Sequence, residues 1–201
     1  MINDTYLSIK EKTEGLFKDK GSKFIAYAYP IKNEKEIKEI IQDLKKEHYS
    51  ARHHCYAYRL GPTGDQYRAN DDGEPSGTAG RPILGQLLSN ELTNVLIVVV
   101  RYFGGTLLGV SGLINAYKNA TADVISKSTI IEHIVEHNYI LTFDYPLQSS
   151  VMRIIKEDEL EIVNAKYEMN CELIVAIRLN KEEGVLNKFQ KIDQLKVDLF
   201  T

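Results

Sequence analysis

The sequence has little of several residue types: its 201 residues include no tryptophan, two cysteines and five prolines. Two cysteines cannot supply the disulfide framework of a small secreted domain, so we interpret Cys55 and Cys171 as reduced thiols. The longest apolar run, Val95–Val100, is far shorter than the roughly 20 residues that a membrane-spanning helix needs. The first residues lack the basic start and apolar stretch of a signal peptide. These absences predict a cytoplasmic protein without membrane contact.

No charge of one sign dominates the sequence, whose formal net charge is −3. Residues 1–130 carry 17 Lys and Arg against 15 Asp and Glu, whereas residues 131–201 carry 8 against 13. Neither part has the dense basic stripe of DNA-binding modules, so we expect no DNA-specific readout. Any contact with nucleic acid would rest on local basic clusters in the first part.

Glycine use divides the chain in two, because twelve of the thirteen glycines precede residue 113 and only Gly184 follows. We therefore expect one domain over residues 1–130 and a second over residues 131–201. The second part has strand-like or helical patterns over 135–143, after Pro146, near 163–169, 171–179 and 185–189, and near 195–199. The order strand, helix, strand, strand, helix, strand predicts a ferredoxin-like domain.

The first part also mixes strands and helices. Strands are predicted over 5–10, 14–20, 23–31, 54–60 and 94–102, and helices after Asn33 and over 110–127. Asn33 and Glu36 resemble a capping box. The stretch 94–102 is apolar at nearly every position, which is typical of a central strand covered on both faces. The helix over 110–127 is expected to pack on that sheet. Its inner side comprises Val110, Leu113, Ile114, Tyr117, Thr121, Val124 and Ile125.

Three carboxylates lie within residues 71–74. They repel one another unless a metal ion, an arginine or a basic partner faces them. The following residues 77–80 open a helix, so their free N–H groups could hold an external anion or the loop's own carboxylates. A purely structural alternative is that the carboxylates cap this helix and pair with Arg81 or Arg101.

A second glycine-rich turn follows the apolar strand at Gly104 and Gly105. Such a turn lets the backbone approach a phosphate closely, although neither a P-loop nor a Gly-x-Gly-x-x-Gly pattern is present. A tight strand-to-helix connection explains the glycines equally well. Arg101, at the end of the apolar strand, needs a partner.

A cysteine beside two histidines, His53-His54-Cys55, suggests a nucleophile or a zinc site. Zinc ligands usually come in spaced pairs, which this sequence lacks. A catalytic Cys–His pair would need a third, orienting group that the sequence does not identify. We therefore interpret Cys55 as a small buried residue. No catalytic residue, metal ligand or cofactor is predicted.

Four motifs occur together in the first part: Lys20-Gly-Ser-Lys-Phe24, Ala51-Arg-His-His-Cys55, Asp71-Asp-Gly-Glu-Pro-Ser-Gly-Thr-Ala-Gly80 and Val99-Val-Arg-Tyr-Phe-Gly-Gly105. They resemble the motifs of the IMPACT or YigZ family. The resemblance implies an α+β protein with a ribosomal protein S5 domain 2-like first domain. It also implies a ferredoxin-like second domain similar to the last domain of the translocation elongation factor. Eukaryotic relatives restrain a kinase that senses uncharged tRNA, so a role associated with translation is implied.

The leading hypothesis is a non-catalytic regulator that binds the ribosome, RNA or a translation-factor partner through the first domain. The predicted contact residues are cationic or aromatic: Lys20, Lys23, Arg52, Arg68, Arg81, Arg101, Tyr102 and Phe103. The motif loops beside them comprise Asp71, Asp72, Gly73, Glu74, Gly77, Thr78, Gly80, Gly104 and Gly105. One alternative is a metal-dependent enzyme acting on a phosphorylated or nucleotide-like small molecule. Another is a protein–protein regulator without nucleic-acid contact, whose rigid loops satisfy one another internally.

Overall fold

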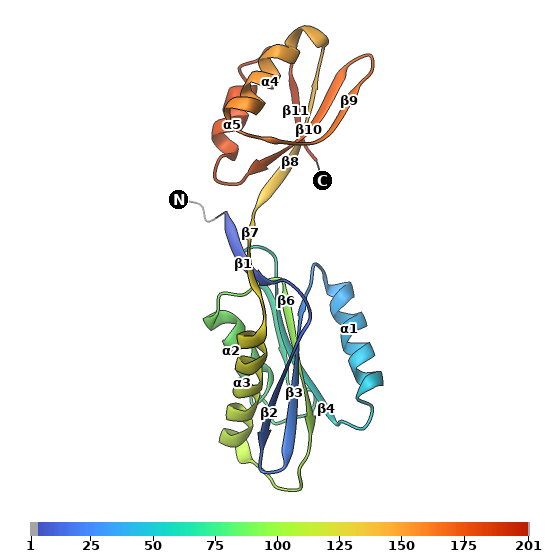
Figure 1. The fold of residues 1–201 in the computed structure, drawn as a ribbon, viewed down its shortest axis with the longest axis vertical. Helices are drawn as coiled ribbons and strands as arrows, with labels where there is room; N and C mark the ends of the chain where they lie inside the picture. The colour runs from blue at the N-terminus through green and yellow to red at the C-terminus, as the bar shows by residue number, and fades with distance from the viewer. Residues whose placement is uncertain (1–3, 201) are drawn as a thin grey trace. The chain divides into compact units, whose positions relative to one another are not determined.

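A computed structural model describes residues 4–200, which form two compact units (Figure 1). The N-terminal unit is Tyr6–His133. Of the described residues, the C-terminal unit contains Ile134–Phe200 together with Asp4 and Thr5. The boundary expected near residue 130 falls in β7 (Ile130–Ile134), which pairs with β1 (Thr5–Ile9) in a two-stranded sheet. None of the helices described for residues 4–200 is long and apolar enough to span a membrane.

The N-terminal unit is built on a five-stranded antiparallel sheet. Its strands, in spatial order, are β2 (Thr13–Asp19), β3 (Ser22–Pro30), β6 (Val95–Tyr102), β4 (His53–Leu60) and β5 (Gln66–Asn70). The central strand β6 is buried at every position but the last, which confirms the prediction of a strand covered on both faces. The edge strand β5 was not predicted, because its residues are polar and mostly exposed.

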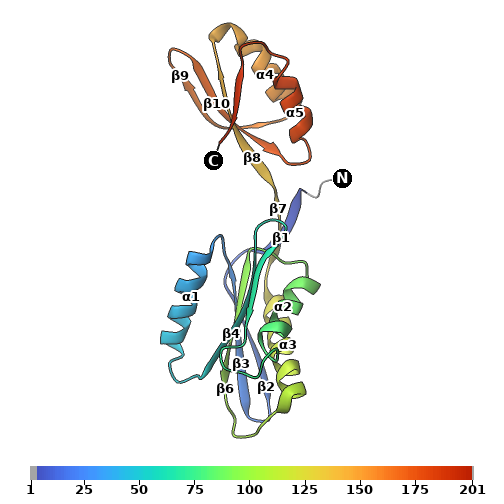
Figure 2. The same cartoon turned by 180° about the vertical axis from the view of Figure 1, so that it is seen from behind.

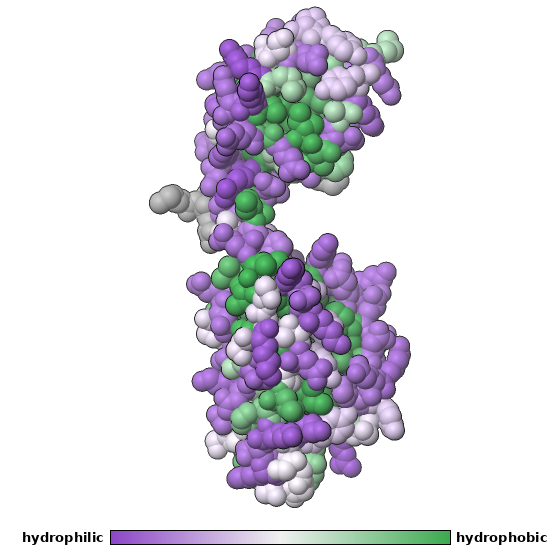
Figure 3. All heavy atoms as spheres, in the orientation of Figure 1, coloured by the Kyte–Doolittle hydropathy of each residue, from purple (hydrophilic) through white to green (hydrophobic). Residues whose placement is uncertain are grey.

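Helices cover both faces of this sheet (Figures 1 and 2). One face carries α1 (Glu34–Glu47), and the opposite face carries α2 (Gly80–Ser89) and α3 (Gly109–Lys127). The capping box at the start of α1 is confirmed in part. The Asn33 carboxamide oxygen accepts the N–H groups of Lys35 and Glu36, but the Glu36 carboxylate accepts the backbone N–H of Lys32 and not that of Asn33. The outer side of α1 is polar (Figure 3), as expected for a helix with one buried stripe.

The prediction for α3 is confirmed in part. Leu113 and Tyr117 pack in the core, with Tyr117 fully buried. Val110 and Ile114 are exposed, contrary to the prediction, because the buried stripe of the helix follows Leu113, Ala116, Tyr117, Ala120 and Val124.

A two-residue turn joins β2 to β3. Asp19 pairs with Ser22, and the intervening Lys20 and Gly21 have φ angles of 44° and 81°. Two consecutive positive φ angles are the geometry of a tight hairpin, whose twist matches that of the strands. The turn is therefore set by local chemistry, and it places Lys20 at the tip of the hairpin.

The C-terminal unit has the ferredoxin-like order that the sequence predicted. Its elements are β8 (Glu136–Phe143), the 3-10 turn η1 (Tyr145–Leu147), α4 (Gln148–Glu157), β9 (Glu161–Tyr167), β10 (Cys171–Arg178), α5 (Glu182–Phe189) and β11 (Lys196–Leu199). The strands lie in the order β11-β8-β10-β9, and each pair of adjacent strands is antiparallel. Near the start of the chain, the Asp4 carboxylate accepts a hydrogen bond from Arg178 Nε at 2.9 Å. The two ends of the chain thus contribute to the same unit.

Candidate functional site

The first carboxylate of the acidic loop closes the start of α2. The backbone N–H groups of Gly77, Ala79 and Gly80 donate to the Asp71 carboxylate at 2.8, 3.0 and 2.8 Å. Burial alone would raise the pKa of Asp71, but these three donors and the Arg81 guanidinium lower it below its ordinary value. The helix start that could have held an external anion is therefore occupied by the protein's own carboxylate.

Glycine is required where this loop meets β5. A Cβ atom at Gly80 would lie 2.5 Å from the backbone nitrogen of Asn70, and Gly77 has a φ of 75°. Thr78 is buried, and its hydroxyl donates to the Pro75 carbonyl oxygen at 2.6 Å. The loop is thus a compact turn whose polar groups bond within it.

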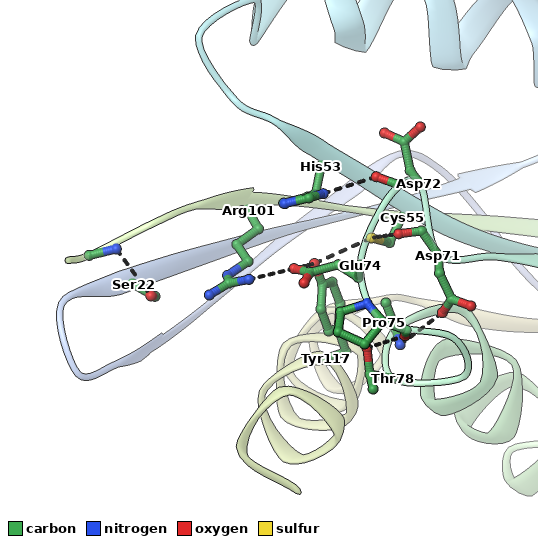
Figure 4. A network of polar contacts seen from close by, with 12 residues as sticks. Ser22, His53, Cys55, Asp71, Asp72, Glu74, Pro75, Thr78, Arg101 and Tyr117 are labelled. Atoms are coloured by element: carbon green, nitrogen blue, oxygen red, sulfur yellow. Dashed lines mark hydrogen bonds and ion pairs between the residues drawn. The ribbon is translucent and has the colours of Figure 1, made fainter. Parts of the chain in front are cut away.

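The third carboxylate of the loop lies in the core. Glu74 is 8% exposed, and its Oε1 accepts hydrogen bonds from Arg101 Nη1 at 2.6 Å and from the Tyr117 hydroxyl at 2.7 Å (Figure 4). Arg101 is itself only 7% exposed. A buried charge needs such a partner, so the ion pair between Glu74 and Arg101 ties the acidic loop to the end of β6.

Cys55 joins this network as a hydrogen-bond donor. Its Sγ lies 3.0 Å from the Asp71 carbonyl oxygen and 3.3 Å from the Tyr117 hydroxyl oxygen. Burial raises the pKa of the Cys55 thiol, and so do the nearby carboxylates. A protonated, fully buried thiol is not a nucleophile. The interpretation of Cys55 as a small buried residue agrees with this geometry.

Asp72 connects the two histidines to α1. The His53 ring donates from Nδ1 to the Asp72 carbonyl oxygen at 2.9 Å, and the His54 N–H donates to the Asp72 carboxylate at 2.7 Å. Lys45 Nζ lies 3.1 Å from the same carboxylate. All three carboxylates of the loop thus have partners from the chain. The structural alternative agrees with Asp71, which caps α2, and with Glu74, which pairs with Arg101. Asp72 does not cap α2.

The described part of the chain, residues 4–200, holds no group of three or more His, Cys, Asp and Glu side chains arranged to bind a metal ion. His53 and Cys55 are two residues apart in β4 and so share a strand face, but the His53 ring bonds to the Asp72 carbonyl oxygen and not to the Cys55 thiol.

The glycine-rich turn after β6 packs against the β2–β3 hairpin. A Cβ atom at Gly104 would lie 1.9 Å from the carbonyl carbon of Gly21, so only glycine fits there. The Gly104 N–H donates to the buried Ser22 hydroxyl at 3.1 Å (Figure 4). Gly105 has a φ of 89°, which agrees with the interpretation of a tight connection.

A pocket of about 650 Å³ opens at the end of β6. Its lining residues are Ser50, Arg52, His53, Arg101, Tyr102, Phe103 and Leu107. Phe103 is 57% exposed and Leu107 is 83% exposed. We call this cavity the β6 pocket. It combines cationic, polar and aromatic groups on one small surface.

Comparisons with known proteins agree with the sequence motifs. The model of the Impact N-terminal domain family matches residues 20–125. IMPACT family member YvyE of Bacillus subtilis is 34% identical over 187 residues, which are 93% of this chain and 84% of the relative. The chain belongs to the IMPACT family. IMPACT family member YigZ of Escherichia coli is 33% identical over 160 residues, or 79% of this chain and 78% of the relative.

The fold of this IMPACT family chain also matches a crystal structure that is described as that of a hypothetical protein. The match covers 100% of this chain and 99% of the other, with a TM-score of 0.72 and 28% sequence identity. The region that matches the family model contains the acidic loop, the buried ion pair and the β6 pocket.

The fold brings together only some of the predicted contact residues. Arg52, Arg101, Tyr102 and Phe103 line the β6 pocket. Lys20 and Lys23 line a separate, smaller cavity of about 340 Å³ at the hairpin, although Lys23 lies opposite Tyr102 in the sheet.

Two predicted contact residues lie elsewhere. Arg68 is on the edge strand β5 opposite Tyr58, and Arg81 is in the first turn of α2. Conversely, Ser50, His53 and Leu107 line the β6 pocket but were not predicted as contacts. His53 belongs to the motif that ends at Cys55 and was considered only as part of a nucleophile or zinc site, whereas the sequence signal for Ser50 and Leu107 is that they flank Arg52 and the Gly104–Gly105 turn.

Proposed function

We propose that this chain is a non-catalytic, translation-associated regulator that contacts ribosomal RNA through the end of β6. The observation that carries the proposal is the β6 pocket, which is lined by Arg52, Arg101 and the exposed ring of Phe103. Cationic side chains contact phosphates, and aromatic rings stack on unpaired bases. Membership of the IMPACT family and the ferredoxin-like second unit support the link to translation.

The charge balance around the pocket is consistent with an anionic partner. The nearby carboxylates of Glu74 and Asp72 are paired with Arg101 and Lys45. Arg52 is exposed, so its charge is accessible to a partner. Lys20 and Lys23 are exposed on the adjoining hairpin and extend the cationic surface.

The geometry also bears on the alternatives. A metal-dependent enzyme would need the acidic loop to bind the metal, and the loop's carboxylates are engaged with Arg101, Tyr117, Lys45 and backbone N–H groups. A protein–protein regulator remains the second candidate function. The observation that favours it is the internal satisfaction of the motif loops, which makes them a rigid surface.

Co-sedimentation of the full chain with ribosomes tests the proposal. We expect pelleting at about 50 mM salt and much less at about 200 mM, because displaced counterions make phosphate contacts salt-dependent. The Lys23→Gln/Arg52→Gln double variant should lose pelleting. The Arg153→Gln/Lys38→Gln variant also removes two positive charges, from exposed positions outside the pocket and the hairpin, and should retain it. Absence of wild-type pelleting at low salt, or equal loss in both variants, would refute the proposal and favour the protein–protein regulator.

Arg101 is unsuitable for this test. Its guanidinium is buried against Glu74, so an Arg101→Ala variant would leave a buried carboxylate without its cation. Loss of binding in that variant would report loss of structure.

A further inference from the structure

The guanidinium of Arg101 has hydrogen-bonding capacity that the chain does not use. Nη1 donates to Glu74, whereas Nε is buried and has no hydrogen-bond partner within residues 4–200. Buried N–H groups without an acceptor are rare in folded proteins. Because Arg101 also lines the β6 pocket, an acceptor from outside the chain could approach this unused edge.

Two aromatic rings flank this guanidinium. Its Cζ lies 5.5 Å from the ring centroid of Phe24 and 5.7 Å from that of Phe103. Phe24 is fully buried, whereas Phe103 lies after the end of β6 and is more than half exposed. Phe103 can therefore rotate without disturbing the core. Because Nε is buried, binding of an acceptor at this edge would require a side chain that lines the pocket, such as Phe103, to move.

The remaining walls of the pocket supply polar groups. The His53 Nδ1 is occupied by the Asp72 carbonyl oxygen, and Figure 4 shows the other ring nitrogen pointing away from Asp72, on the Arg101 side. Arg52 adds an exposed cation, and Ser50 adds a hydroxyl that can donate or accept. The pocket therefore pairs an aromatic and aliphatic side, Phe103 and Leu107, with a cationic and polar side.

We propose that the β6 pocket holds one nucleoside monophosphate unit, either a free nucleotide or an unpaired residue of an RNA strand. The base lies against Phe103 and Leu107, and the phosphate is bound by Arg52 and the free edge of Arg101. Pockets of about 300–1,000 Å³ are typical for ligands of this size. The RNA source rests on the proposed function, whereas the free nucleotide does not.

The absence of tryptophan from the sequence allows a direct test. A Phe103→Trp variant places a single tryptophan fluorophore in the pocket. The matched control is Tyr67→Trp, which places it on the exposed edge strand β5. Each variant is titrated with the four ribonucleoside 5′-monophosphates, with nucleosides, with inorganic phosphate and with a ten-residue single-stranded RNA. Circular dichroism and urea unfolding establish that both variants fold.

We expect saturable quenching of the tryptophan at position 103 by the monophosphates or by the RNA, and none in the Tyr67→Trp control. Adding Arg52→Gln should weaken this binding about tenfold, through loss of a charge-assisted hydrogen bond. Adding Arg52→Lys should restore part of it. Quenching by monophosphates alone identifies a free nucleotide as the ligand, and quenching by the oligonucleotide alone identifies RNA.

Flat titrations with both the monophosphates and the RNA would overturn the proposal. Equal affinity for inorganic phosphate and for the monophosphates would overturn the base contact. Salt-sensitive pelleting with ribosomes combined with flat titrations would support contact between the cationic surface and ribosomal phosphates, without a nucleotide bound in the pocket. Saturable titration without any ribosome pelleting would support the nucleotide site in the β6 pocket and refute the proposed contact with ribosomes.

Discussion

At the scale of single residues, the three carboxylates of the acidic loop are each satisfied by a different group. The Asp71 carboxylate accepts hydrogen bonds from backbone N–H groups. The Asp72 carboxylate accepts them from Lys45 and from the His54 N–H. The Glu74 carboxylate accepts them from Arg101 and Tyr117. Buried charges are stable only with such partners. The cluster that suggested a metal site in the sequence thus holds the loop, α2 and the end of β6 together.

Asp71→Ala is expected to lower the free energy of unfolding by about 1–2 kcal/mol at pH 7, the usual cost of losing a helix cap. Urea unfolding followed by circular dichroism measures the change. Asp43→Ala is the control, because Asp43 is an exposed residue of α1 whose pair with Lys46 contributes little. A loss in Asp71→Ala no larger than in Asp43→Ala would contradict the capping role.

The same variant has a defined pH dependence. The pKa of Asp71 is lower in the folded state than the ordinary value of about 3.9. A lowered pKa contributes stability that is fully present above the ordinary value and is lost as the pH falls through the folded value. The difference in unfolding free energy between wild type and Asp71→Ala should therefore be constant above about pH 5 and shrink below about pH 4. A difference that grows on acidification would contradict this assignment.

At the scale of elements, α2 contains two glycines in opposite surroundings. Gly80 faces the backbone of Asn70 so closely that a Cβ atom does not fit, whereas Gly85 has no atom within 4 Å of such a position. We expect Gly85→Ala to stabilise the protein by about 0.5–1 kcal/mol, since alanine loses less backbone entropy in a helix. Gly80→Ala should destabilise it. Thermal unfolding of both variants checks this contrast, and equal effects would refute it.

The elements that sequence patterns predicted are those with strong local signals. The apolar run of β6, the Asn33 cap of α1 and the strands of the C-terminal unit fall where expected. The strand β5 and the pairing of β1 with β7 were missed, because the first is polar and the second depends on residues far apart in the chain.

In the candidate site, too, contacts between residues close in the sequence were easier to predict than contacts between distant residues. The capping of α2 by Asp71 spans nine residues and was among the expected alternatives. The contacts of Glu74 with Arg101 and Tyr117 span 27 and 43 residues. The sequence predicts Arg81 or Arg101 as a partner of the carboxylates and gives no indication of Tyr117. The split of the predicted cations between the β6 pocket, the hairpin, β5 and α2 follows from sheet order, which periodicity does not specify.

At the scale of the whole molecule, each unit contains one buried free cysteine, Cys55 in the N-terminal unit and Cys171 in the C-terminal unit. A buried thiol reacts with a labelling reagent only when its surroundings open. The two cysteines therefore report separately on the opening of the two units.

Asp4→Ala should accelerate labelling of Cys171 and leave that of Cys55 unchanged, because Asp4 bonds to Arg178 within the C-terminal unit. The pair is partly exposed, so we expect a rate increase of roughly threefold to tenfold. Mass spectrometry of peptides after pulsed alkylation measures both sites in one sample. Equal acceleration at both cysteines would contradict the assignment of Asp4 to the C-terminal unit.

The contact between Asp4 and Arg178 also orders events during synthesis. The two residues are 174 positions apart, so at about 5–20 residues per second Asp4 waits roughly 9–35 s for its partner to be made. The N-terminal unit, whose last residue is His133, can fold during that interval. A chain that stops after His133 but before Arg178 therefore carries a complete N-terminal unit and an Asp4 carboxylate without its arginine, which distinguishes such interrupted products from completed ones.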